Sequence, residues 1–173
     1  QNNYIDLPVV GIEPSCLLTF NDEYQTLKNV NNKEQIKNKF YLLEEFILEQ
    51  IRNNNNIKAN KFDQNVLIHG HCHQKSQDRM KGLTNLLSEL NINNKMIESS
   101  CCGMAGSFGY DSKTYEVSKK MANLSLIPAI NNSDEKDFIV ANGTSCRHQI
   151  SDLSEKKGKH VSELLFKIFE TVN

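Results

Sequence analysis

Four short apolar runs, each followed closely by a cysteine-containing cluster, constrain the fold of this chain more than any other feature. All five cysteines lie in these clusters and nowhere else. In chain order, run and cluster occupy residues 8–12 and 13–16, 65–68 and 69–74, 95–98 and 100–106, and 137–141 and 143–149. If the runs are parallel strands of one sheet, the five thiols gather at its carboxyl edge, where open α/β sheets bind their ligands.

The segments between the runs have apolar residues at helical spacing. We expect a break near Pro128 and an N-cap at Ser112. Alternating strands and helices predict an α/β fold, a parallel sheet flanked by helices with the cysteines at the carboxyl ends of its strands. The predicted helices cover residues 17–27, 33–52, 78–90, 113 onward and 160–172.

Length and charge exclude several classes of protein. The 173 residues suffice for one domain with a core, and the net charge of -1 with scattered lysines gives no attraction to nucleic acid. No run of 18 apolar residues could span a membrane. An odd cysteine count argues against a disulfide framework and favours a reduced, cytosolic protein. The start at Gln1, without Met or a signal peptide, suggests a piece of a longer polypeptide.

A gathering of thiolates predicts a soft-metal site, with an iron–sulfur cluster as the leading candidate. Cys101 and Cys102 are adjacent, and from a regular strand they would point to opposite faces. In a loop at the end of a strand both can face one site, since Gly103 relaxes the backbone. The candidate metal ligands are Cys16, Cys72, Cys101, Cys102 and Cys146.

Six further residues are expected to surround the cofactor. The glycines let backbone N–H groups approach it, and the imidazoles and guanidinium can donate hydrogen bonds that tune its potential. These residues are Gly103, Gly106, His71, His73, Arg147 and His148. His69, in contrast, is expected only to pack within its strand.

Other interpretations of the cysteines stay open. A structural zinc site needs four ligands, which Cys72, Cys101, Cys102 and Cys146 could supply. A thiol enzyme could use the vicinal pair beside His73, although adjacent cysteines form only a strained disulfide ring. Metal-free structural thiols are a third alternative.

The sequence Cys101-Cys102-Gly103, followed by Gly106, resembles the signature of the cysteine-rich (CCG) domain family. That family includes a component of heterodisulfide reductase and the iron–sulfur components of glycolate oxidase and anaerobic glycerol-3-phosphate dehydrogenase. Residues 11–18, 71–75, 101–110 and 143–150 more specifically resemble the carboxyl end of FAD-linked oxidases of the D-lactate or D-2-hydroxyglutarate dehydrogenase type.

The resemblance implies an iron–sulfur electron-transfer module, with a 4Fe-4S cluster that is cubane or non-cubane. It implies FAD on an upstream domain that oxidises a 2-hydroxy acid, and electron flow toward a quinone or another carrier. The expected partners are upstream flavin and ferredoxin-like domains or subunits, without nucleic acid or a transmembrane segment. The expected location is cytoplasmic, with peripheral attachment to the inner face of the membrane as an alternative. No substrate site is expected in this chain.

The family normally carries two repeats, and the resemblance divides this chain between them. Residues 1–30 correspond to the end of a truncated first repeat and residues 31–173 to a complete second repeat. Cys16 belongs to the first, and the other four cysteines belong to the second. Gln149 stands where a relative has the second cysteine of Cys-x-x-Cys, so whether Cys16 supplies a fifth ligand stays open.

Overall fold

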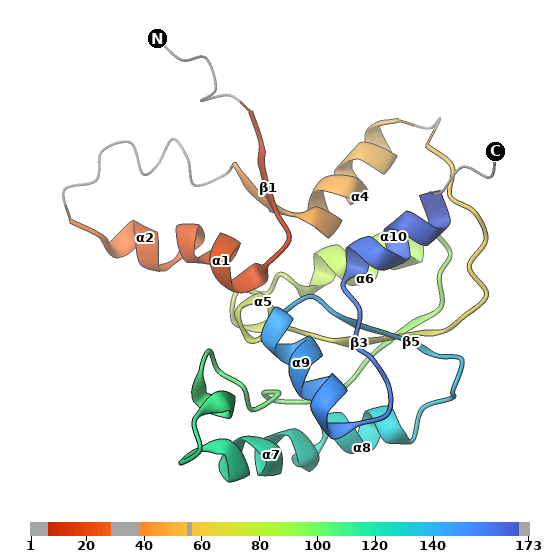
Figure 1. Ribbon diagram of the computed structural model, residues 1–173. Coiled ribbons are helices and arrows are strands. Elements are labelled where there is room, and N and C mark those ends of the chain that lie inside the picture. The colour runs from red at the N-terminus through yellow and green to blue at the C-terminus, as the bar shows by residue number, and fades with distance from the viewer. Residues whose placement is uncertain (1–6, 29–38, 55–56, 170–173) are drawn as a thin grey trace.

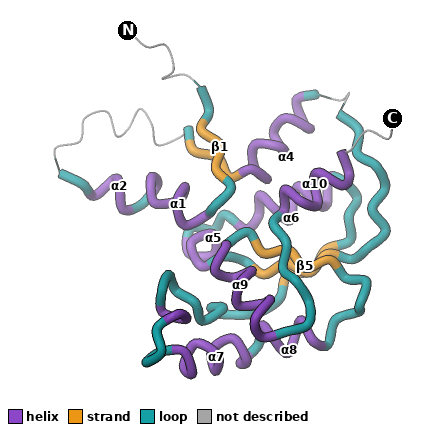
Figure 2. Tube along the Cα trace, in the orientation of Figure 1, coloured by secondary structure: helices purple, strands orange, loops and turns teal. Residues whose placement is uncertain are grey.

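The structure is a computed structural model that describes residues 7–28, 39–54 and 57–169. All strand pairs between its named strands are parallel, and they form two sheets (Figure 2). One sheet pairs β1 with β2, and the other has the order β4-β3-β5. The strands are β1 (Val9–Gly11), β2 (Phe40–Leu42), β3 (Val66–His69), β4 (Asn94–Met96) and β5 (Phe138–Ala141).

Helices cover both faces of the three-stranded sheet, which confirms the predicted α/β class (Figure 1). Helices α4, α6 and α10 pack on one face, and α7, α8 and α9 pack on the other. The helices are α1 (Pro14–Leu18), α2 (Glu23–Thr26), α4 (Leu43–Asn53), α5 (Cys72–Ser76), α6 (Met80–Glu89), α7 (Tyr115–Leu124), α8 (Leu126–Asn131), α9 (Thr144–Leu153) and α10 (Val161–Phe169). Within the described ranges, none has the length and apolarity that crossing a bilayer requires.

Side chains alternate along the central strands and separate the core into two layers. In β5, Phe138 and Val140 join the layer of α4, α6 and α10, whereas Ile139 joins the layer of α7, α8 and α9. In β3, Ile68 belongs to the first layer and Leu67 packs against the second. By the same alternation, His69 at the end of β3 lies on the side of α7, α8 and α9.

The order of the strands creates a switch point at the carboxyl edge. After β3 the chain runs to α6 on one face, and after β5 it runs to α9 on the opposite face. The crevice between the ends of β3 and β5 is the place where open α/β sheets bind ligands. Cys72 and Cys146 follow these two strands, so two of the candidate ligands lie at the edge where the site is expected.

The first apolar run differs from the prediction. It forms β1, which pairs with β2 instead of extending the three-stranded sheet. The partner strand, Phe40–Leu42, falls inside the helix expected over residues 33–52, so that helix begins only at Leu43. The Leu42 backbone N–H donates to the Glu45 carboxylate at 3.0 Å and fixes this start. Residues 33–38 of the expected helix lie outside the described residues.

Other helix boundaries also shift. The helix expected over residues 17–27 is interrupted by a short 3-10 turn and by the non-helical backbone of Asp22 (φ -123°, ψ -86°). Ser112 is not the N-cap of α7, because this helix begins at Tyr115 and its N-cap residue is Thr114. The break expected near Pro128 falls at Ser125, since a proline cannot donate to the carbonyl four residues before it. Helix α10 is described to Phe169, and residues 170–172 lie outside the described part.

A buried carboxyl group connects α4 to α5 and to the turn after β5. The Glu44 side chain in α4 is 1% exposed. Its Oε1 accepts hydrogen bonds from Gln74 Nε2 at 2.7 Å and from Asn142 Nδ2 at 2.9 Å. Asn142 Oδ1 in turn accepts the backbone N–H of Val161 at 3.1 Å. Burial raises the pKa of Glu44 to about 7, so this carboxyl group holds a proton in mildly acidic solution.

We predict that Glu44→Gln alters the pH dependence of stability. The folded pKa lies above the ordinary value of 4.5, so the stabilising contribution is complete below pH 4.5 and is lost as the pH rises to about 7. The loss amounts to about 3 kcal/mol, which the uncharged glutamine avoids. Urea unfolding at pH 5 and pH 8 should show the variant gaining on the wild type at the higher pH. Glu49→Gln, at an exposed position of the same helix, serves as the control. Parallel pH profiles of wild type and Glu44→Gln would contradict this role.

Candidate metal centre

Four of the five thiols meet at the carboxyl edge of the three-stranded sheet. Cys72 begins α5, Cys101 and Cys102 lie in the loop after β4, and Cys146 lies in the first turns of α9. Cys102 and Cys146 are buried, and the other two are half-buried. The Cys146 thiol is hydrogen-bonded to Cys102, and Cys72 is hydrogen-bonded to Cys101. Three of the segments that the sequence analysis placed at one edge therefore bring these thiols together as two neighbouring pairs.

The thiols impede each other's ionisation. The hydrogen bond to Cys102 and burial raise the pKa of Cys146, and the same hydrogen bond lowers the pKa of Cys102. Burial and the neighbouring Cys101 raise the pKa of Cys72. Because like charges at this distance oppose each other, the four sulfurs cannot all be thiolates without a cation among them. The donor set therefore suits a metal ion or cluster that releases the protons on binding.

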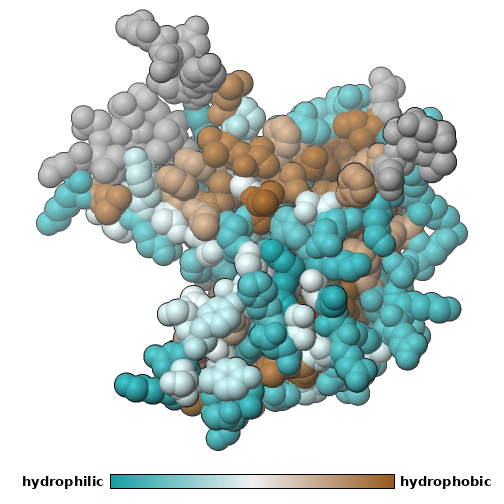
Figure 3. All heavy atoms as spheres, in the orientation of Figure 1, coloured by the Kyte–Doolittle hydropathy of each residue, from teal (hydrophilic) through white to brown (hydrophobic). Residues whose placement is uncertain are grey.

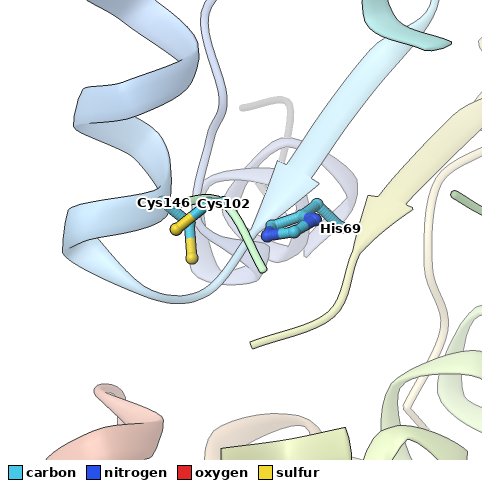
Figure 4. A group of neighbouring side chains, drawn as sticks. All are labelled: His69, Cys102 and Cys146. Atoms are coloured by element: carbon cyan, nitrogen blue, oxygen red, sulfur yellow. The ribbon is translucent and has the colours of Figure 1, made fainter. Parts of the chain in front are cut away.

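His69 adds an imidazole to the thiols. Its donor atom and the sulfurs of Cys102 and Cys146 all lie within 4.8 Å of one another, and all three residues are buried (Figure 4). His69 Nδ1 is hydrogen-bonded to Ser99 Oγ at 2.9 Å, and Nε2 has no nitrogen or oxygen partner, with the Cys102 thiol as the group beside the ring. The sequence analysis assigned His69 only to packing. His69 stands two residues after Leu67, so the alternation of side chains along a strand places both on the same face of β3. The sequence does not reveal on which face of the sheet the thiols gather.

One glycine of the loop after Cys102 contacts a sulfur. The backbone N–H of Gly103 donates to Cys101 Sγ at 3.2 Å. Gly103 and Gly106 both have positive φ, +91° and +67°, which side chains rarely tolerate. A Cβ at position 103 would lie 2.3 Å from the backbone oxygen of Ser118, whereas a Cβ at position 106 would meet nothing within 4 Å. Only position 103 needs glycine for space as well as for conformation.

His71, one of the two histidines beside Cys72, caps the start of α5. His71 Nδ1 accepts the backbone N–H of His73 at 3.2 Å and so caps the helix. The Nε2 atom of His71 lies 4.0 Å from Glu13 Oε1. Burial lowers the pKa of His71, so its ring favours the neutral form that can accept this bond.

Arg147 and His148 form bonds within the protein. Arg147 donates to the backbone oxygens of Ala141 and Asn142, at 3.0 and 2.5 Å, where β5 ends. His148 is exposed, and its Nδ1 is hydrogen-bonded to Tyr110 Oη at 2.6 Å. Arg147 thus stabilises the turn that carries Cys146, and His148 links this helix to the glycine loop.

Cys16 lies outside the group of four thiols. It is in α1, and it is the one cysteine of the chain with an exposed side chain. Nearby Glu13, to which the sequence analysis gave no role, does reach the site. Its Oε2 accepts the backbone N–H and the hydroxyl of Thr144, at 2.9 and 2.8 Å. The segment before Cys16 is therefore attached to the helix that carries Cys146.

Gln149, at the position where a second cysteine was noted as missing, is buried in the same region. Its Nε2 donates to the backbone oxygen of Cys102 and to Ser118 Oγ, both at 2.9 Å. It lies one turn after Cys146 in α9, so its amide connects the helix of Cys146 to the loop of Cys102. At this position the chain uses a polar connection instead of a further sulfur.

Comparison with known proteins identifies the class of this region. Residues 66–151, from β3 through most of α9, match the family model of the cysteine-rich domain. This segment is a cysteine-rich (CCG) domain, and it contains His69 and every cysteine except Cys16. No solved structure matches the chain significantly.

Curated proteins similar to this chain include dehydrogenases and a component of one. The chain is 22% identical to D-2-hydroxyglutarate dehydrogenase of Pseudomonas putida, over 92% of this chain and 15% of the relative. It is 22% identical to one component of the anaerobic glycerol-3-phosphate dehydrogenase of Escherichia coli, over 92% of this chain and 40% of the relative. D-2-hydroxyglutarate dehydrogenase of Haemophilus influenzae is 23% identical, over 96% and 17%. The chain thus spans well under half the length of these relatives.

We predict that Gly103→Ala and Gly106→Ala differ in their effect. A side chain at φ +67° costs about 1 kcal/mol, so Gly106→Ala should fold with a slightly lower melting temperature. Gly103→Ala should lower the free energy of unfolding by about 3 kcal/mol. Its Cβ also displaces Ser118, and it shifts the backbone N–H that donates to Cys101 Sγ. Thermal unfolding and metal content of the two variants test this difference. Equal stability of the two would contradict the close packing at position 103.

Proposed function

We propose that this chain is the iron–sulfur electron-transfer part of a flavin-dependent 2-hydroxy acid oxidoreductase. The observation that carries the proposal is the proximity of two pairs of cysteines at the switch point of a parallel sheet. Similarity to parts of D-2-hydroxyglutarate dehydrogenases and to a component of a glycerol-3-phosphate dehydrogenase supports it.

The residues around the thiols fit such a group. Cysteine thiolates are the ligands that iron–sulfur clusters take, and Cys72, Cys101, Cys102 and Cys146 would hold it. Such a group, cubane or non-cubane, accepts and releases single electrons when it is bound. Cys102 and Cys146 belong to the apolar layer of α7, α8 and α9, which keeps water from the sulfurs. The Gly103 N–H stabilises negative charge on the Cys101 sulfur.

The remaining parts of the reaction belong to partners in this proposal. FAD on an upstream domain or subunit would oxidise the hydroxy acid, and the chain would pass electrons toward a quinone or another carrier. Residues 1–30 would close a first repeat, and residues 31–173 would form the second. A cytoplasmic location suits thiols that must stay reduced.

A structural zinc site is the second candidate. The specific observation in its favour is the mixed donor set, because Cys102, Cys146 and His69 are ligands that tetrahedral zinc also takes. In this case the domain would stabilise an interaction with its partners and would carry no electrons.

Metal analysis distinguishes the two candidates. We expect iron and acid-labile sulfide in similar amounts, with a broad visible absorption band, in protein purified without oxygen. Zinc without sulfide or colour would replace the electron-transfer proposal by the structural one. Protein with neither metal after anaerobic reconstitution would refute both.

Serine variants test which thiols bind. We expect Cys101→Ser and Cys146→Ser to lose most of the iron, because each removes a thiolate from the group of contacting sulfurs. Cys16→Ser is the matched comparison at an exposed thiol, and from its position we expect it to keep the iron. Loss of iron in Cys16→Ser would show that the first segment supplies a fifth ligand.

A further inference from the structure

We propose that His69 is a direct ligand of the bound iron or zinc through its Nε2 atom, beside Cys102 and Cys146. This inference rests on the proposed function, since it assumes that the thiols hold a metal. The site then has mixed nitrogen and sulfur donors instead of sulfur alone.

The first argument is an unpaired nitrogen in the interior. His69 is 1% exposed, and its Nε2 has no nitrogen or oxygen partner; the group beside the ring is the Cys102 thiol, a weak hydrogen-bond partner. Leaving a buried polar atom unpaired costs about 1–3 kcal/mol, so native structures rarely retain one without a bound partner. The ring directs a nitrogen toward the sulfurs of Cys102 and Cys146, and the three donor atoms lie within 4.8 Å of one another (Figure 4). A metal ion at this place would satisfy all three.

The second argument is the way in which the ring is held. Ser99 Oγ lies 2.9 Å from Nδ1, so a proton on Nδ1 can be donated to the hydroxyl, and Nε2 keeps its lone pair for a metal. Ser99 is itself fixed, because its backbone oxygen accepts Lys75 Nζ at 2.5 Å. Orientation of a ligand imidazole through its second nitrogen is the usual arrangement at protein metal sites.

The other histidines near the site have their nitrogens engaged differently. His160 is hydrogen-bonded through both nitrogens, to Ser162 and to the backbone oxygen of Ile12. His71 uses Nδ1 to cap α5, and its Nε2 is near Glu13. Among the described residues, the only other buried side-chain atom without a partner is Gln74 Oε1, which is not in the group around Cys102. Of the two buried histidines, His69 and His160, His69 is therefore the one with a nitrogen left for the thiols, while the half-buried His73 ring packs edge-on against His71.

The consequence for the site is a change in charge. An imidazole is a neutral ligand, whereas a thiolate carries a negative charge, so a centre with His69 at one position is easier to reduce than one with a thiolate there. For zinc, the same ligand with three of the thiolates would complete a tetrahedral Cys₃His set.

The test compares the wild type with His69→Ala, purified without oxygen after labelling the histidines with ¹⁵N. For iron, pulsed electron paramagnetic resonance of the reduced protein should show coupling to a histidine nitrogen. The coupling should disappear in His69→Ala and persist in His148→Ala, an exposed histidine that serves as the control. For zinc, X-ray absorption should show one nitrogen among the sulfur neighbours. His69→Ala should also bind the metal at least about tenfold more weakly, the loss that changes to outer partners of a site already cause.

A second variant guards against a misfolded alanine protein. His69→Cys replaces the nitrogen by a sulfur donor, so it should retain the metal, lose the nitrogen coupling and have a lower reduction potential. A bound metal with sulfur neighbours alone, or an unchanged potential and spectrum in His69→Cys, would overturn His69 ligation while leaving the metal site intact. Wild-type protein without iron or zinc would overturn the proposed function and this inference together.

Discussion

The site depends on the cost of ionising several thiols in one buried place. Cys102 and Cys146 share a hydrogen bond in the interior, and Cys72 and Cys101 lie close enough to affect the ionisation of Cys146. Without a cation, the protons stay on part of the group, as the raised pKa of Cys146 indicates. The thiols at the switch point of the sheet are therefore fully ionised only when positive charge lies among them. The same arrangement links metal binding to proton release.

The remaining structure serves to hold these sulfurs from several directions. Gln149 binds the Cys102 loop from α9, and Arg147 closes the turn between β5 and α9. Glu44 connects α4 both to Gln74 in the helix of Cys72 and to Asn142 before the helix of Cys146. These polar contacts are buried or half-buried, so each is stronger than it would be in water. The positions of the cysteine sulfurs are thus set by hydrogen bonds among neighbouring polar residues.

The sequence predicted the class of fold and the edge at which the thiols meet, because strand-like runs before cysteines follow a simple rule of α/β sheets. The rule depends only on local apolarity and on the direction of the strands. It failed for β1, since pairing between β1 and β2 is decided by tertiary contacts that local spacing does not encode. The helical spacing around Phe40 was equally misleading, because Phe40–Leu42 form a strand that pairs with β1. His69 was missed for a related reason: alternation gives its side of the strand, but not which groups from other segments lie on that side.

The bonds between Glu13 and Thr144 have a mechanical consequence. Glu13 follows β1 and precedes the exposed Cys16, while Thr144 begins the helix that holds Cys146. His160 adds a second attachment of the same segment through the backbone oxygen of Ile12. A displacement of the segment after β1 is therefore passed to the first turn of α9 through Glu13, and to the start of α10 through His160. The two-stranded sheet is thus bonded to the helix turn that carries Cys146, and a partner that binds β1 or β2 would act on the position of that sulfur.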